Sequence, residues 1–290
     1  MYEYSGKFLT LMLCSDCNNN CKHCYIKYKG QFTEETLKQL IPEFSKKYSI
    51  MFNGTEPIMH QEYFQFFKEA GAHSIMTNGL ELMWNPELMD VLLDNGINQI
   101  WLSYHFGIQD DISLVKTEEL NKLVITLKEK GFIVKLMTSL CKDNYRDVEK
   151  MCEKANDLGA DRIRFTNFIY QGSASDNYSN SSLLTQEDID WVLNKIDEIR
   201  NKYDKTKLYI DRCGSFGPKL KQENFECLAI NKNVVMTPDG NIYMCVFDID
   251  KGNEIGKLID GKVMIYDEYQ NTKSNYCRVL SKYNNIHREN

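Results

Sequence analysis

The stretch Cys17-Asn18-Asn19-Asn20-Cys21-Lys22-His23-Cys24 brings three thiols together directly after the apolar run 8–13. That run indicates a buried strand, so the thiols follow the end of the first strand. A loop with this spacing can bind three corners of a cubane iron–sulfur cluster, and it leaves one iron without a protein thiolate. An iron with an open position can bind a substrate or cofactor as well as pass an electron.

Short apolar strands alternate with amphipathic helices over residues 8–170. Near-continuous apolar runs are typical of parallel strands that are covered on both faces. The expected strands lie at 8–13, 49–52, 74–77, 99–104, 133–140 and 162–169. Six βα units predict an α/β fold with a parallel sheet, either open or curved into a partial (β/α)6 barrel like part of a TIM barrel. In both cases the functional residues are expected at the carboxyl ends of the strands.

The remainder of the chain has a different character. The polar, turn-rich stretch 171–183 predicts a loop, and we expect residues 1–183 to form the barrel and 184–206 a bridging helix. Residues 207–290 are expected to form a small cluster-binding domain. Within it, Pro238-Asp239-Gly240-Asn241 lies between two apolar runs, which predicts a β-hairpin.

Composition limits the classes of partner and compartment. The 290 residues carry a formal net charge of −6, which argues against nucleic acid or an anionic membrane as the main partner. The N-terminus lacks the pattern of a secretion signal, and no apolar run approaches the ~20 residues that span a bilayer. Ten cysteines without an export signal favour metal sites or catalysis over disulfides, so we expect a cytoplasmic protein.

At Cys17, Cys21 and Cys24 the chain resembles the radical S-adenosylmethionine (SAM) superfamily, both in spacing and in position after the first strand. The resemblance implies that the open iron of a [4Fe–4S] cluster binds the amino and carboxylate groups of SAM. One electron, from an external donor such as flavodoxin or ferredoxin, then cleaves SAM to a 5′-deoxyadenosyl radical that abstracts a substrate hydrogen. His23 fills the position before the last cysteine, where the family usually has an aromatic residue near the adenine.

The ends of the next three strands extend the resemblance. Asn53-Gly54-Thr55-Glu56-Pro57 is similar to the family's Gly-Gly-Glu motif, with Asn53 in place of the first glycine. The motif implies that Gly54 lets the backbone approach the ligand and that Glu56 accepts hydrogen bonds from the methionyl amine. Asn78 follows the third strand within Thr77-Asn78-Gly79. Ser103 and His105 lie at the end of the fourth strand, where relatives often place a polar contact to SAM. Each feature alone is an ordinary turn, but three at successive strand ends favour the superfamily.

A second resemblance lies in the C-terminal part. Cys227-x12-Gly240-x4-Cys245 spans the expected hairpin and is similar to the opening of SPASM and Twitch auxiliary-cluster domains. Cys213 and Cys277 would complete a fully thiolate-ligated auxiliary cluster, which we expect to be a [4Fe–4S] cluster. A full SPASM domain has more cysteines downstream, so one auxiliary cluster is expected. An unliganded thiol remains the alternative for both Cys213 and Cys277.

Other residues have two interpretations. Cys141, or Cys213, could donate a hydrogen atom to a substrate radical, although a buried strand-end cysteine is the favoured interpretation of Cys141. Arg164, beside Arg162, could neutralise a carboxylate of SAM or substrate, or be a solvated charge. Cys14 could form a zinc pair with Cys17, but Cys14 is most simply a core residue.

Cys152, on the apolar side of an expected helix, is also interpreted as a core residue.

The resemblance favours a maturase that epimerises, crosslinks or oxidises a ribosomally made peptide. A dehydrogenase of a small alcohol or sugar is the alternative. A non-enzymatic electron carrier or zinc-binding protein is a more remote one, because the open-iron loop and Glu56 would then have no role.

Overall fold

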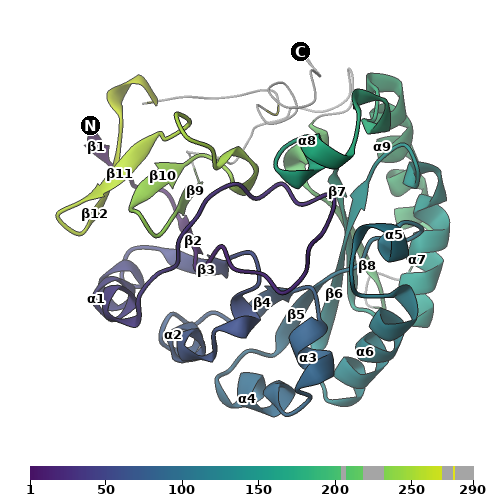
Figure 1. The fold of residues 1–290 in the computed structure, drawn as a ribbon, viewed down its shortest axis with the longest axis horizontal. Helices are drawn as coiled ribbons and strands as arrows, with labels where there is room; N and C mark the ends of the chain where they lie inside the picture. The colour runs from purple at the N-terminus through teal and green to yellow at the C-terminus, as the bar shows by residue number, and fades with distance from the viewer. Residues whose placement is uncertain (204–206, 218–231, 270–276, 278–290) are drawn as a thin grey trace.

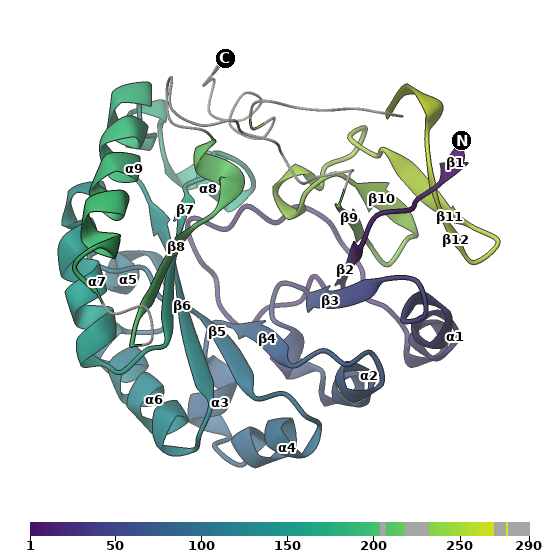
Figure 2. The ribbon, with the colours of Figure 1, turned by 180° about the vertical axis from the view of Figure 1, so that it is seen from behind.

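The computed structural model describes residues 1–203, 207–217, 232–269 and 277. Figure 1 shows the described part as a crescent, with strands on the inside and helices on the outside, and with a second sheet at one end. Figure 2 gives the same arrangement from behind. Two sheets make up this architecture.

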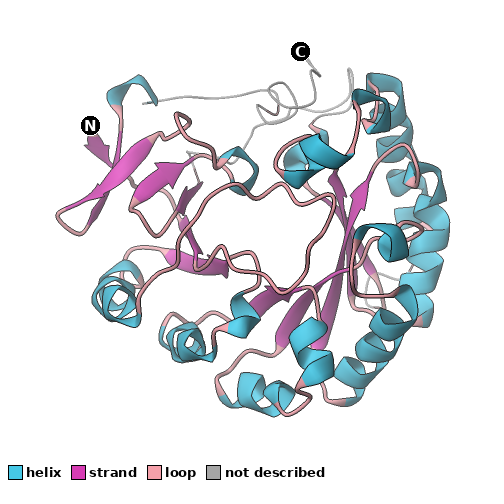
Figure 3. Ribbon diagram, in the orientation of Figure 1, coloured by secondary structure: helices cyan, strands magenta, loops and turns pink. Residues whose placement is uncertain are grey.

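The first sheet is parallel and has the strand order β4-β5-β6-β7-β8. Its helices cover one face, which is the outer, convex face in Figure 3. The strands are β4 (Ser74–Thr77), β5 (Gln99–Ser103), β6 (Ile133–Leu140), β7 (Arg162–Asn167) and β8 (Tyr209–Arg212). The covering helices are α3 (Leu80–Trp84), α4 (Leu88–Asp94), α6 (Thr117–Glu129), α7 (Val148–Asp157) and α9 (Gln186–Arg200).

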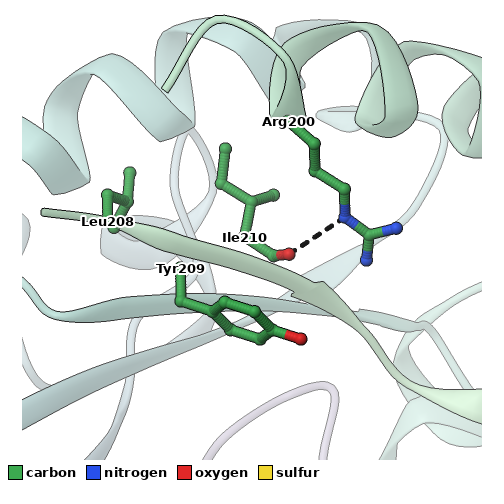
Figure 4. A pocket seen from close by; sticks show the side chains of 4 residues that line it. All are labelled: Arg200, Leu208, Tyr209 and Ile210. Carbon is green, nitrogen blue, oxygen red and sulfur yellow. Dashed lines mark hydrogen bonds between the residues drawn. The ribbon is translucent and has the colours of Figure 1, made fainter. Parts of the chain in front are cut away.

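Alternation along the strands separates the two faces of this sheet. On β6, Val134 and Leu136 are fully buried and belong to the main core with the apolar residues of α6 and α7. The residues between them, Lys135 and Met137, are only partly buried and lie on the other, concave face. Figure 4 shows the same alternation on β8, where Ile210 points toward α9 and Tyr209 lies on the opposite side.

The second sheet is mixed, with the order β1-β12-β11-β10-β9-β2-β3. Both β3 and β9 pair in parallel with β2, whereas β9 to β12 form an antiparallel meander. The strands are β1 (Tyr2–Glu3), β2 (Phe8–Met12), β3 (Ser49–Asn53), β9 (Asn233–Met236), β10 (Asn241–Tyr243), β11 (Gly256–Ile259) and β12 (Lys262–Ile265). The remaining helices are α1 (Glu34–Phe44), α2 (Phe64–Glu69), α5 (Gln109–Ile112) and α8 (Ser173–Asn177).

The predicted fold class is confirmed: an α/β partial barrel carries a small C-terminal sheet, and β9 and β10 form the expected hairpin. The prediction of a single six-stranded sheet is wrong in detail, because β2 pairs with β9 and β3 pairs with β2, so that both strands belong to the mixed sheet. Hydrophobic periodicity identifies a strand but not its partner. The expected bridging helix, α9, leads into an additional barrel strand, β8, which pairs with β7.

The division of the chain at residues 183 and 206 stays a prediction, and the pairing of β8 favours a second boundary after Arg212. In the described part of the chain, every helix is too short or too polar to cross a bilayer.

Candidate functional site

The cysteine loop, residues 15–30, follows β2 and is drawn in Figure 1 as the dark purple trace running toward β7. A bridge between Cys14 and Gln31 closes it, and the Ser15 amide donates to the Gly30 carbonyl at 2.9 Å. A short apolar strand on one side and this bridge on the other therefore fix both ends of the loop.

Asn19 anchors the middle of the loop to the segment that follows β5 and α5. Its amide nitrogen donates to Ser113 Oγ at 2.9 Å, and its amide oxygen accepts from the Leu114 backbone amide at 3.0 Å. The Lys22 amide donates to the Ile112 carbonyl at 3.0 Å. Because Asn19 is only 9% exposed, water competes little for these hydrogen bonds.

The three thiols predicted to bind a cluster are neighbours on this loop. Burial, with smaller contributions from the thiols of Cys17 and Cys24, raises the pKa of Cys21 to about 12. In the described part of the chain, no three His, Cys, Asp or Glu side chains are placed closely enough to hold a metal ion. Ligation by Cys17, Cys21 and Cys24 thus stays a prediction.

Glu56 and Asn78 join the cysteine loop to the ends of β3 and β4. The Glu56 carboxylate is buried and accepts hydrogen bonds from the Thr77 hydroxyl and, at 2.7 Å, from the Asn78 backbone amide. The Asn78 side chain donates to Asn18 Oδ1 at 2.9 Å and to Cys17 Sγ at 3.7 Å. Burial raises the pKa of Glu56 to about 8, while its hydrogen bonds from Thr77 and Asn78 act in the opposite direction.

Asn53 and Gly54 have local roles beside this network. Asn53 ends β3, and its side chain accepts from the Gly54 amide at 2.9 Å. A Cβ at position 54 would lie 3.2 Å from Cys14 Sγ, so the motif's glycine allows close packing on Cys14. Cys14 is fully buried, as is Cys152, which confirms both as core residues.

Two histidines meet beside the loop. The rings of His23 and His105 are 4.3 Å apart and nearly perpendicular. Burial lowers the pKa of His23 to about 4 and holds the pKa of His105 well below its usual value, so both rings are neutral at pH 7. The Ser139 amide donates to His105 Nδ1 at 3.2 Å, whereas His23 Nδ1 is buried without a hydrogen-bond partner among the described residues. Ser103 ends β5, two residues before His105.

Arg164 lies apart from the other predicted cofactor-binding residues. Its guanidinium forms an ion pair with Asp211 of β8 and covers the Trp101 ring, 4.6 Å from the ring centroid. The predicted contact with SAM is untested, but the pairing of Arg164 places it along the strand, below the carboxyl ends.

Cys141 and Cys213 occupy different environments. Cys141 is buried in an apolar cluster with Phe168, Ala174 and Leu183, and its amide donates to Asn144. Cys213 follows β8 and is partly exposed. A role as hydrogen donor stays a prediction for both, and the enclosure of Cys141 does not favour it there.

Tyr25, next to the last cysteine of the loop, lies close to the C-terminal cysteines. Burial is the main cause that raises the pKa of Tyr25, and the thiols of Cys24, Cys245 and Cys213 raise it further. Its ring also meets Phe247 edge-on at 4.8 Å. Cys245 and Cys277 are both partly exposed, whereas Cys227 lies outside the described residues. The auxiliary cluster is therefore a prediction, and the structure adds that two of its four thiols, Cys213 and Cys245, influence the pKa of the same tyrosine.

The sequence analysis missed Asn18, Asn19 and Tyr25. All three lie within or beside the cysteine motif, in positions that its pattern leaves open, so position in the loop was the only available signal.

The residues present fit an iron–sulfur cluster with SAM. The donor set has the chemistry of cluster ligands, which are deprotonated thiolates. Buried polar atoms without partners in the described structure occur in the cysteine loop, at His23 Nδ1, and at or just after the end of β7, at both amide atoms of Asn167 and at Gln171 Oε1. Buried polar atoms normally have partners, so these orphans indicate a place for a polar ligand.

No protein-family model matches the chain. The Fe-coproporphyrin III synthase of Methanosarcina barkeri is 25% identical over 256 residues, which cover 74% of this chain and 61% of that protein. The pre-heme d1 synthase of Dinoroseobacter shibae is 22% identical over 176 residues, covering 56% and 43% of the two chains. The chain therefore spans less than two thirds of the length of both curated relatives.

Solved structures share the fold. SuiB of Streptococcus suis, determined bound to S-adenosylmethionine, has a TM-score of 0.70 at 13% identity, covering 86% of this chain and 62% of that chain. The protein anSMEcpe, determined with bound AdoMet and a peptide, has a TM-score of 0.63 at 18% identity, covering 92% and 81%. Both are SPASM-domain radical SAM enzymes. This chain is thus similar to radical SAM enzymes, and its C-terminal sheet resembles a SPASM domain.

Proposed function

We propose that the protein is a radical SAM enzyme that binds a [4Fe–4S] cluster through Cys17, Cys21 and Cys24. The observation that carries this proposal is the hydrogen-bonded chain Glu56–Asn78–Cys17, which joins the motifs after three different strands at one place. Metal ligands and their hydrogen-bonding neighbours need such fixed geometry. A set of ordinary turns has no reason to converge in this way.

When bound, the cluster and SAM would together supply a 5′-deoxyadenosyl radical that abstracts a hydrogen atom from the substrate. The chain's own residues would orient that chemistry. The Glu56 carboxylate, held by Thr77 and Asn78, keeps lone pairs for the amine of a ligand. Neutral His23 and His105 would present ring faces and an unpartnered nitrogen to a polar aromatic group.

For the substrate, the two curated relatives support a tetrapyrrole related to heme, since both names describe synthases of such compounds. The peptide favoured by the sequence analysis is the second candidate. Its support is that the structure of SuiB was determined with its precursor peptide bound. At 12% identity, however, the similarity shows only that the two proteins share a fold. A sugar or alcohol has no comparable support.

We also propose one auxiliary cluster, held by Cys213, Cys227, Cys245 and Cys277. The electrostatic influence of Cys24, Cys213 and Cys245 on Tyr25 supports it, because thiols from both predicted ligand sets then lie near one side chain. An external electron donor such as flavodoxin or ferredoxin would serve the first cluster.

Anaerobic reconstitution tests the cofactors. About eight irons per chain are expected for two [4Fe–4S] clusters and about four for one. The reconstituted protein, given SAM and a strong reductant, should release 5′-deoxyadenosine. Cys17→Ala should abolish that release, whereas Cys152→Ala, a buried cysteine on α7, should retain it. Zinc in place of iron, or release by the Cys17→Ala protein, contradicts the proposal.

Substrate class is tested by mass spectrometry of the reaction with heme-related tetrapyrroles that carry carboxylate side chains and, in parallel, with candidate precursor peptides. A mass change in a tetrapyrrole that needs SAM and reductant supports that class of substrate. Cys141→Ala in the same reaction tests the hydrogen donor, and an unchanged rate removes Cys141 from that role.

A further inference from the structure

A basic cluster, formed by Lys135, Arg162 and Arg164, lies on the concave face of the five-stranded sheet, away from the cysteine loop. Register pairs Trp101 of β5 with Lys135 of β6, Lys135 with Arg162 of β7, and Arg162 with Tyr209 of β8. Arg164 follows two residues later on the same face. Tyr209 identifies this face as the concave one. In Figure 4, Ile210 points toward the helix α9, and Tyr209 lies on the opposite side of the strand.

Three cations surround one indole ring in this cluster. The charged ends of Arg164, Lys135 and Arg162 lie 4.6, 5.0 and 5.2 Å from the centroid of the Trp101 ring. Arg162 also covers the Tyr209 ring at 4.7 Å. Cation–π contacts favour each cation individually, but they do not remove the repulsion among the three.

Negative charge near the cluster is smaller than the positive charge. Asp211 accepts from both arginines, with Arg164 Nε at 2.8 Å. The next nearby carboxylate, Asp161, is already bound by Lys128 at 2.6 Å and by the Val134 amide at 2.7 Å. Among the described residues, three cations thus share one available carboxylate.

Two further observations indicate a missing anion. Burial lowers the pKa of Lys135, and Arg162 and Arg164 lower it further, as expected where positive charge exceeds negative. Arg162 Nε is a buried donor without an acceptor in the described structure. The side chains of Arg162 and Arg164 are nevertheless 24% and 31% exposed, so an anion in solution can reach them.

The position of the cluster limits the length of its ligand. Strand residues rise about 3.3 Å each, so Arg164 and Arg162 lie roughly 10 and 16 Å below the end of β7 at Asn167. The cysteine loop contacts residues beyond the strand ends. A molecule that reaches from there to the cluster must be extended, which favours a substrate over SAM as the partner of Arg164.

We propose that Lys135, Arg162 and Arg164 bind a carboxylate of the substrate and hold the rest of it below the cysteine loop. This proposal rests on the proposed function for the identity of the substrate, a tetrapyrrole with carboxylate side chains. The guanidinium forks suit a carboxylate because they can donate two parallel hydrogen bonds. The Trp101 ring adds a flat apolar surface beside them.

Binding of coproporphyrin III to the reconstituted protein, followed by absorbance titration without reductant, tests the proposal independently of radical chemistry. Arg164→Gln and Lys135→Met should each weaken binding about tenfold or more, the value of one charge-assisted hydrogen bond. Arg164→Lys should recover part of the loss. The tetramethyl ester of the porphyrin should bind no more tightly to wild type than to Arg164→Gln.

Asp211→Asn should change the affinity for the porphyrin in the opposite direction. It removes the competing carboxylate and should tighten binding, which general damage to the fold would not do. Arg146→Gln is the matched control, since Arg146 also covers a tryptophan ring, Trp191 at 4.4 Å, but outside the cluster. Its affinity should equal that of wild type.

Release of 5′-deoxyadenosine by the wild-type protein without substrate tests the proposed function separately: its absence would contradict the proposed function and would leave the basic cluster untouched. Equal porphyrin affinity in wild type, Arg164→Gln and Lys135→Met would overturn the proposal. So would no binding by wild type, or binding of a glutamate-rich peptide in place of the porphyrin.

Discussion

Replacement of Asn19 by alanine should loosen the cysteine loop without altering any predicted ligand. Asn19 makes two hydrogen bonds across to the segment after β5, at 2.9 Å to Ser113 and 3.0 Å to Leu114, and its side chain is buried. Each bond contributes about 0.5–1.5 kcal/mol net, so their loss should cost about 1–3 kcal/mol. That free energy corresponds to roughly a 5- to 150-fold shift in the equilibrium between anchored and detached loop.

Two measurements report this shift. Hydrogen exchange at the Leu114 amide should accelerate, because that amide loses its acceptor, and this readout needs no metal. In the reconstituted protein, a chelator should bleach the visible absorbance of the cluster faster. Asn20→Ala is the control, since Asn20 is the adjacent residue of the same type and is exposed. Equal exchange at Leu114 in the Asn19→Ala and Asn20→Ala proteins would refute the reasoning.

Two other changes test neighbouring features. A Cβ at Gly172 (φ +64°) would lie 2.6 Å from the Cys24 carbonyl oxygen, so Gly172→Ala should lower both stability and iron content; Gly159→Ala, at φ +73° in open space, should lower stability alone. Burial by itself would raise the pKa of Asp188, but hydrogen bonds from Lys142 and the start of α9 hold it below its usual 3.8. The contribution of the Asp188 carboxylate to the free energy of unfolding is therefore fully present above its usual pKa of 3.8, and it is lost as the pH falls through the lowered pKa. Asp188→Asn should lower the urea-unfolding free energy by about 1–3 kcal/mol at pH 7, and this difference should vanish on acidification.

The sequence could predict those parts of the site that are contiguous in the chain. Three cysteines after an apolar strand, and Glu56 and Asn78 after the next two, follow from local pattern, because parallel strands present their carboxyl ends at the same edge. The strands themselves were found because each is a short apolar run. β8 was missed because Ile210 is its only apolar residue in the buried core, so Tyr209–Arg212 has almost no hydrophobic signal.

The tertiary structure alone decided how distant segments meet. Nothing in the sequence pairs β2 with β9, sets Asn19 against Ser113, or gathers Lys135, Arg162 and Arg164 around Trp101. Periodicity assigns a residue to a face of its own strand, whereas register between strands depends on packing of the whole sheet. The sequence by itself thus determined the cysteine motif and the class of fold, and the sheet register decided which charges share the concave face.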